Sequence, residues 1–152
     1  MNDDGTGATS TIISGINAAA VEALATGRPS VISMSLGGPP NISIDNAVRI
    51  LSVNHLHPLH ALTCVPQVSN VINQGIPFIV AAGNESQDAN NVSPARLPQA
   101  ITVGATTIDD TFAAFSNFGN KVDILAPGQD ILSANNQTDT AVAKLSGTSM
   151  AT

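Results

Sequence analysis

Three short apolar runs constrain the fold of this chain more than any other feature. Residues 31–36, 78–82 and 100–105 each show the pattern of a strand buried in a sheet, and the first stops at the turn-forming residues 37–40. The 152 residues are enough to bury one core, and an apolar content of 43% with few charges suits a well-buried domain. We therefore predict a single domain of the α/β class.

An amphipathic helix is predicted between residues 9 and 27. Thr9 or Ser10 can cap its start, and Gly27 can end it in a left-handed conformation. Apolar residues at steps of three and four define one face of this helix: Ile13, Ile16, Ala20 and Leu24. We expect this face to pack on the sheet.

A second predicted helix is interrupted. Ser43 can cap it, and its apolar face is lost after Arg49. Residues 50–69 hold two prolines, all three histidines and the single cysteine; without them, the apolar stripe of residues 44–48 continues at helical spacing into residues 71–72 and ends at Gly75. We interpret residues 50–69 as an insertion foreign to the fold, either a true surface loop or the translation of a retained intron.

The same insertion offers an alternative function as a metal-binding module. It contains four side chains of the kinds that bind zinc, namely His55, His57, His60 and Cys64. Pro58 separates the candidate ligands, and no second cluster fixes their geometry. We therefore favour an unstructured loop over a zinc site.

Charge and hydropathy limit the classes of partner. The net charge of −6 and the absence of a basic run argue against a nucleic-acid partner. No apolar run reaches membrane-spanning length, so no membrane partner is expected, and residues 1–8 lack the features of a signal peptide. Cys64 is alone, which excludes an internal disulfide.

A serine and an asparagine stand out as candidate catalytic residues. Ser149 follows a small-residue turn and precedes helix-forming residues, so its hydroxyl is expected at a helix N-terminus, where free N–H groups stabilise negative charge. Asn84 follows the apolar run 78–82, at the end of a strand where open α/β sheets bind ligands. Its side-chain N–H and the backbone N–H of Ser149 are candidate oxyanion donors. The alternative is an ordinary Ser/Thr-rich loop and a strand-end asparagine.

These two segments resemble the subtilisin-like serine proteases, in particular the proteinase K-like subgroup. Residues 147–152 (Gly-Thr-Ser-Met-Ala-Thr) match the nucleophile segment of that family, and residues 81–84 (Ala-Ala-Gly-Asn) match its oxyanion segment. The resemblance implies a three-layer α/β/α domain with a mainly parallel sheet, here incomplete at both ends, because it covers the second half of a catalytic domain. It also implies a secreted, monomeric endopeptidase that hydrolyses polypeptides through an acyl-enzyme.

The resemblance further implies a substrate cleft with two rims. Gly5, Thr6 and Gly7 would form one rim, Ser35, Leu36 and Gly37 the other, and an extended peptide would pair between them. Residues Leu36, Ala81, Ala82 and Gly83 would border an apolar side-chain pocket. A phosphate-binding loop at the first glycines and a plain strand exit at residues 35–37 are the alternatives.

A structural calcium ion is also implied by the resemblance, although the chemistry requires no cofactor. Its ligands would be the backbone carbonyls of Pro98 and Ala100 and the carboxylate of Asp123. Alternatively, Asp123 is a buried capping carboxylate. Nearby, residues 111–119 match another segment of the family, and the three phenylalanines there are expected in the core: Phe112, Phe115 and Phe118.

The aspartate and histidine of the family's catalytic triad are not found in this sequence. Their motifs would lie N-terminal to residue 1, and the three histidines present lie in residues 50–69 without the family's context. Serine needs a base to act as a nucleophile, so we expect the isolated polypeptide to have negligible peptidase activity. We also expect it to aggregate or be degraded. The main alternative function is a non-catalytic, peptide-binding remnant.

Overall fold

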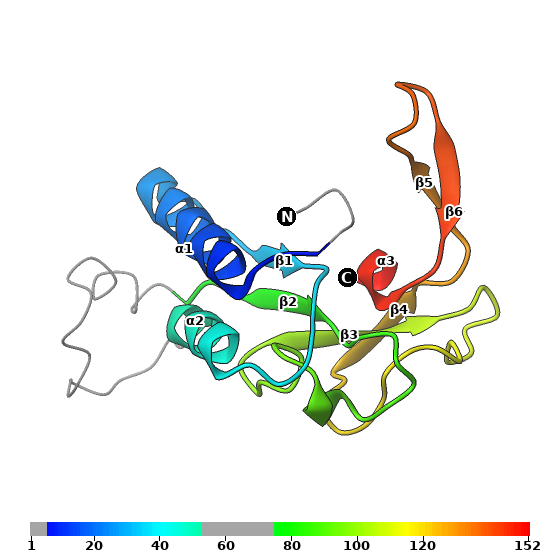
Figure 1. Ribbon diagram of the computed structural model, residues 1–152, viewed down its shortest axis with the longest axis horizontal. Helices are drawn as coiled ribbons and strands as arrows, with labels where there is room; N and C mark the ends of the chain where they lie inside the picture. Colours follow the sequence, from blue (N-terminus) through cyan, green and yellow to red (C-terminus); the bar gives the residue numbers. More distant parts are fainter. Residues whose placement is uncertain (1–5, 53–74) are drawn as a thin grey trace.

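The fold is built on a four-stranded parallel sheet (Figure 1). The computed structural model describes residues 6–52 and 75–152. The strands are β1 (Ile32–Met34), β2 (Phe78–Ala81), β3 (Ile101–Thr106) and β4 (Ile124–Pro127), and their order in the sheet follows the chain. All neighbouring strands are parallel, so the segments that follow the four strands all leave from the same end of the sheet, where the strands have their C-termini. The predicted α/β class with a parallel sheet is confirmed.

Helix α1 (Thr9–Thr26) carries the predicted apolar face, and its Ile16 and Ala20 are buried. Gly27 ends it in the left-handed region at φ 62°. The predicted caps Thr9 and Ser10 are wrong, because the helix already includes both residues and Ala8 stands at the N-cap without a side-chain bond. No helix in residues 6–52 and 75–152 combines the length and apolar character needed to cross a bilayer.

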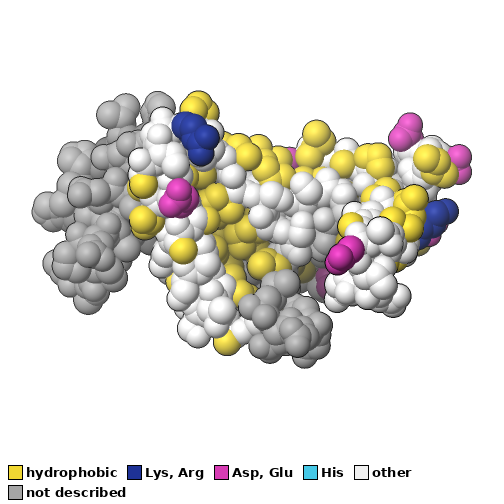
Figure 2. Space-filling model, turned by 90° about the horizontal axis from the view of Figure 1, so that it is seen from above, with side chains coloured by type: hydrophobic (Ala, Val, Ile, Leu, Met, Phe, Trp, Pro, Cys, Tyr) yellow, Lys and Arg dark blue, Asp and Glu magenta, His cyan; other side chains and the backbone are white. Residues whose placement is uncertain are grey.

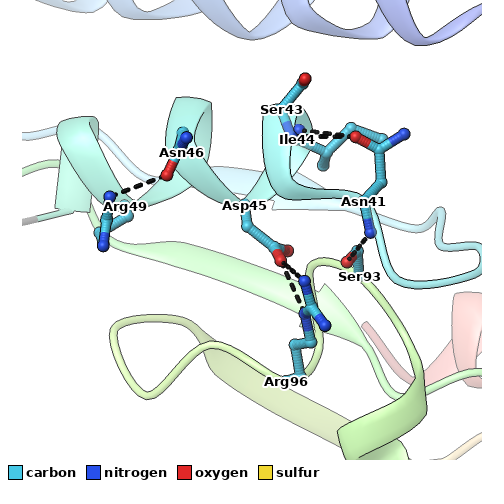
Figure 3. A network of polar contacts seen from close by, with 8 residues as sticks. All are labelled: Asn41, Ser43, Ile44, Asp45, Asn46, Arg49, Ser93 and Arg96. Carbon is cyan, nitrogen blue, oxygen red and sulfur yellow. Dashed lines mark hydrogen bonds and ion pairs between the residues drawn. The ribbon is translucent and has the colours of Figure 1, made fainter.

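Helix α2 (Ile42–Ser52) begins one residue before the predicted cap Ser43. Asn41 caps it instead, because its Oδ1 accepts hydrogen bonds from the N–H groups of Ser43 at 3.0 Å and Ile44 at 3.2 Å (Figure 3). The helix runs three residues beyond Arg49. The rest of the proposed insertion lies outside the described residues, together with the candidate zinc ligands, so its foreign origin stays a prediction.

The core lies where α1 and α2 pack against β1 and β2. Its central members come from all four elements: Ile16, Ala20, Met34, Val48, Phe78 and Val80. Phe78 is the largest side chain that is fully buried. The prediction that three phenylalanines enter the core is wrong for two of them, because Phe112 and Phe118 are 43% and 50% exposed. In that segment the fully buried side chains are the small Ala113 and the polar Ser116 and Asn117.

An antiparallel hairpin that the sequence did not predict connects β4 to the last helix. Its strands are β5 (Ile131–Ala134) and β6 (Val142–Leu145), and it projects away from the sheet (Figure 1). At its base, the Gly147 N–H donates to the Gly128 carbonyl at 2.8 Å. This contact brings α3 (Thr148–Ala151) against β2, β3 and β4.

Candidate active site

Asn84 lies against the residue that precedes Ser149. Asn84 follows β2, and its Oδ1 accepts hydrogen bonds from the Thr148 N–H at 2.7 Å and from the Thr148 hydroxyl at 3.0 Å. On the other side of Thr148, a Cβ built on Gly147 would lie 3.6 Å from Asn84 Nδ2. The structure therefore brings together the two segments that the sequence singled out, although they are 64 residues apart.

The two bonds to Oδ1 also orient the Asn84 amide. They assign the oxygen to Thr148 and leave the Nδ2 donors without a hydrogen bond to any described residue. The backbone N–H of Ser149 lies in the first turn of α3, where N–H groups have no intrahelical partner. An exposed asparagine donor and a helix N-terminus thus flank the candidate nucleophile.

The Ser149 hydroxyl makes a reciprocal contact with Ser35. It donates to the Ser35 carbonyl at 3.2 Å, and the Ser35 hydroxyl donates to the Ser149 carbonyl at 2.9 Å. This pair joins α3 to the segment that leaves β1. No imidazole is found near Ser149 in residues 6–52 and 75–152, because all three histidines lie outside these ranges. Within the described residues, the hydroxyl therefore lacks the base that would activate it.

Thr148 is a site residue that the sequence analysis missed. It is fully buried, and its hydroxyl accepts from the Gly83 N–H at 3.1 Å while it donates to Asn84. One side chain therefore ties α3 to two consecutive residues of the candidate oxyanion segment. Its position directly before the nucleophile in the matched segment was the available signal.

One residue from each predicted substrate rim lines a common groove. Gly7 and Leu36, one from each rim, both line a groove of about 290 Å³ between α1 and β1. Most of its other lining is apolar, and Figure 2 shows hydrophobic side chains gathered beside α1 on this face. Thr6, Gly7, Ser35 and Gly37 are exposed, whereas Gly5 lies outside the described residues. At least one residue of each predicted rim therefore borders this groove.

The predicted side-chain pocket is less open than its sequence implied. The side chains of Ala81 and Ala82 are buried in the core, and Gly83 is half-buried with φ 100°. A separate cavity of about 370 Å³ lies next to this segment, and none of the predicted lining residues borders it. It is lined by Gly38, Pro39, Pro40, Glu85, Gln87, Asn91 and Val92, so it contains a carboxylate.

A polar network holds the segment after β1 against the loop after β2 (Figure 3). Gly38 and Ser93 exchange two backbone hydrogen bonds at 3.0 and 3.1 Å, and the Ser93 hydroxyl accepts from the Asn41 N–H at 2.7 Å. Next to it, the buried carboxylate of Asp45 on α2 forms an ion pair with Arg96. Helix α2 thereby braces the loop beneath one rim.

Asp123 is not the buried carboxylate that was one of the two alternatives. It is exposed, and its Oδ2 accepts from the Thr102 N–H at 2.8 Å, so the carboxylate is held beside the backbone of β3. Its Oδ1 bonds to no described residue. The three predicted calcium ligands, this carboxylate and the carbonyls of Pro98 and Ala100, are all oxygen atoms, the type that calcium prefers. No group of three or more His, Cys, Asp or Glu side chains suited to a metal occurs among the described residues.

Comparison with known proteins agrees with this geometry. The model of the subtilase family matches residues 1–152. Alkaline protease 1 of Aspergillus clavatus is 44% identical over 149 residues, which are 97% of this chain and 32% of that protein. The cuticle-degrading serine protease of Arthrobotrys oligospora is 42% identical, over 99% of this chain and 32% of its own length.

A solved structure extends the agreement to three dimensions. A cold-adapted subtilisin-like serine proteinase matches with a TM-score of 0.75 at 41% identity, over 97% of this chain and 45% of that one. The chain thus spans about a third of the length of the curated relatives above. Sequence, fold and the placement of Asn84 beside the Ser149 segment lead to one conclusion: the chain belongs to the subtilase family.

Proposed function

We propose that the full-length protein containing this chain is a subtilisin-like serine endopeptidase, with Ser149 as nucleophile and Asn84 as oxyanion donor. One observation carries the proposal. The Asn84 side chain accepts hydrogen bonds at Oδ1 from Thr148, the residue before Ser149, and its Nδ2 makes no hydrogen bond to any residue that the structure describes. Donors fixed in advance, where negative charge will develop, are the main source of catalysis in acyl transfer.

The reaction would proceed in two steps. The Ser149 oxygen attacks the carbonyl carbon of the peptide bond, its proton passes to a base, and Asn84 Nδ2 and the Ser149 N–H stabilise the resulting oxyanion. Collapse of this intermediate expels the amine, which takes the proton, and leaves an acyl-enzyme that water hydrolyses. The base and its orienting carboxylate would come from parts of the protein outside these residues.

The substrate would be an extended polypeptide bound in the groove between Gly7 and Leu36. Leu36 and Gly83, the partly exposed members of the predicted side-chain pocket, would favour apolar side chains next to the cut bond. A relative from Thermus that is 42% identical is named an extracellular serine proteinase, which supports an extracellular location for this protein as well. We propose a monomer, with calcium bound at Pro98, Ala100 and Asp123.

A peptide-binding remnant without activity is the second candidate function. The observation that favours it is the lack of a histidine near Ser149 among the described residues, while both rims of the groove survive. A fluorophosphonate probe separates the two in the full-length protein, since only an activated serine reacts rapidly. Rapid labelling of Ser149 supports the enzyme, and no labelling supports the remnant.

Substitutions in the full-length protein test the roles of the two residues. Ser149→Ala should lower kcat by about 10⁶-fold and Asn84→Ala by about 10²–10³-fold, which are the magnitudes established for the corresponding losses in subtilisin, a member of this family. Ser133→Ala, on the exposed strand β5, is the matched control and should leave kcat unchanged. A Ser149→Ala variant that keeps more than about one hundredth of the activity would refute the proposal.

A further inference from the structure

Asn117 is a fully buried polar side chain that the proposed mechanism leaves unused. Its side chain bonds only to the segment after β2 that carries Asn84. Nδ2 donates to the Ala82 carbonyl at 2.9 Å and to the Glu85 carboxylate at 2.7 Å. Oδ1 accepts from the N–H groups of Glu85 at 3.1 Å and Gln87 at 2.9 Å. Its hydrogen-bonding capacity is therefore spent on the residues on both sides of Asn84.

The backbone of Asn117 makes a matching contact with Gly83. Its N–H donates to the Gly83 carbonyl at 3.0 Å. Gly83 has φ 100°, and a Cβ built on it would lie only 2.3 Å from Asn117 Nδ2. The Asn117 amide thus fills the space where any other residue at position 83 would place its side chain. The path of the chain into Asn84 is set by this contact.

Other residues also bond to the segment around Asn84: Thr148 contacts Gly83 and Asn84, while Ser86 and Gln87 bond to the backbone of residues 114–118. None of these partners bonds on both sides of Asn84, as the Asn117 side chain does. Residues 82–87 form neither helix nor strand, and Asn84 itself is exposed. Its side chain bonds to Thr148, but that contact requires the backbone at Asn84 to be already in place. A buried side chain with four bonds to such a segment is well suited to hold it rigid.

We infer that Asn117 is the positioning residue of the oxyanion site: it fixes the backbone before and after Asn84, so that Asn84 Nδ2 faces the reacting carbonyl. Asn117 touches no substrate and acts only through Asn84. This inference rests on the proposed function, and it adds a residue that neither the sequence analysis nor the proposed mechanism assigned.

Three variants of the full-length protein isolate this role. Asn117→Asp has the same shape and keeps the oxygen that accepts from Glu85 and Gln87, but it loses both donors and faces a carboxylate. Adding Glu85→Gln restores a donor between the two side chains. Asn120→Ala is the control, because Asn120 lies three residues away, is exposed and accepts one bond from Asn90 at 3.1 Å.

The first readout is peptidase kinetics. Asn117→Asp should lower kcat by about 10- to 100-fold, the effect of a small misplacement of a catalytic group, with KM changed less than about twofold. The same substitution should have no further effect in an Asn84→Ala background, and Glu85→Gln should recover most of the loss. Two results would overturn the inference. One is that the losses from Asn117→Asp and Asn84→Ala multiply when the two are combined, and the other is that adding Glu85→Gln to Asn117→Asp recovers no activity.

The second readout does not depend on activity. Backbone hydrogen exchange over residues 82–87 should be faster in Asn117→Asp, unchanged in Asn120→Ala and slowed again when Glu85→Gln is added. If the wild-type protein proves inactive, the proposed function fails, whereas exchange still decides whether Asn117 holds this segment. Unchanged exchange in Asn117→Asp would refute the positioning role. If Asn117→Asp alone does not fold, exchange over residues 82–87 is compared between the Asn117→Asp, Glu85→Gln double variant and the Glu85→Gln single variant.

Discussion

At the scale of single residues, two glycines of this chain should respond to alanine with opposite signs. Gly83 has φ 100°, and a Cβ added to it would lie 2.3 Å from Asn117 Nδ2. Gly15 is exposed within α1, and a Cβ added to it would meet no neighbouring atom within 4 Å. Gly83→Ala should lower the free energy of unfolding by roughly 2–5 kcal/mol, from backbone strain and overpacking. Gly15→Ala should raise it by about 0.5–1 kcal/mol, because glycine weakens a helix interior.

Denaturant unfolding of both variants of the full-length protein measures these changes. Each variant serves as the control for the other, since the chemical change is identical. A Gly83→Ala protein as stable as wild type would mean that Asn117 does not occupy the space beside residue 83.

At the scale of elements, the ion pair between Asp45 and Arg96 connects α2 to the loop after β2. Asp45 is 3% exposed and its Oδ1 has no hydrogen-bond partner. The Arg96 guanidinium is therefore the main group that offsets the cost of burying the Asp45 charge. Arg96→Ala should destabilise the protein toward the lower end of about 3–5 kcal/mol, because the Arg96 side chain is 29% exposed and water can reach the site.

The double variant Asp45→Asn, Arg96→Ala provides the matched comparison. It removes the buried charge together with its partner, and should therefore be more stable than Arg96→Ala alone in the same unfolding measurement. A double variant less stable than Arg96→Ala would show that Asp45 stabilises the protein independently of Arg96.

Asp123 connects the start of β4 to β3, and a substitution there can distinguish calcium binding from a simple hydrogen bond. Asp123→Asn keeps an acceptor for the Thr102 N–H but removes the charge that a cation needs. If calcium binds, chelation should lower the Tm of the wild type and leave Asp123→Asn unaffected. Asp139→Asn, in the exposed turn of the hairpin, should behave as wild type. A wild type indifferent to chelation would rule out the proposed calcium site.

The strands and the site could be predicted from the sequence to different degrees. Three of the four sheet strands were found because residues such as Phe78 and Val80 form continuous apolar runs in a buried parallel sheet. The fourth, β4, was missed because most of its residues are exposed. The hairpin was missed because its strands are short and carry mostly exposed side chains, so no buried pattern marks them. Phe118 was misplaced because apolar character alone does not reveal that Asn117, its polar neighbour, points inward. The bonds of Asn117 join segments about 30 residues apart, which no local pattern encodes.

At the scale of the whole molecule, the 152-residue chain alone should self-associate. Exposed large apolar side chains occur on the sheet edge and hairpin, including Leu125 at 43%, Leu132 at 62% and Val142 at 64%. The edge strand β1 also borders the apolar groove beside α1. Unpaired strand edges and exposed apolar patches promote association. Size-exclusion chromatography should show large species that bind a hydrophobic dye, with the full-length protein as the control. Elution as a 15.4 kDa monomer without dye binding would contradict this expectation.

The central claim is that Ser149 and Asn84 act on the same carbonyl oxygen, and the structure of a covalent adduct tests it most directly. The full-length protein would be treated with a peptidyl phosphonate, whose tetrahedral phosphorus mimics the intermediate, and its crystal structure determined. We predict a bond between phosphorus and Ser149 Oγ, with the phosphonyl oxygen about 2.7–3.1 Å from both Asn84 Nδ2 and the Ser149 N–H. An adduct on another residue, or a phosphonyl oxygen turned away from Asn84, would contradict the claim.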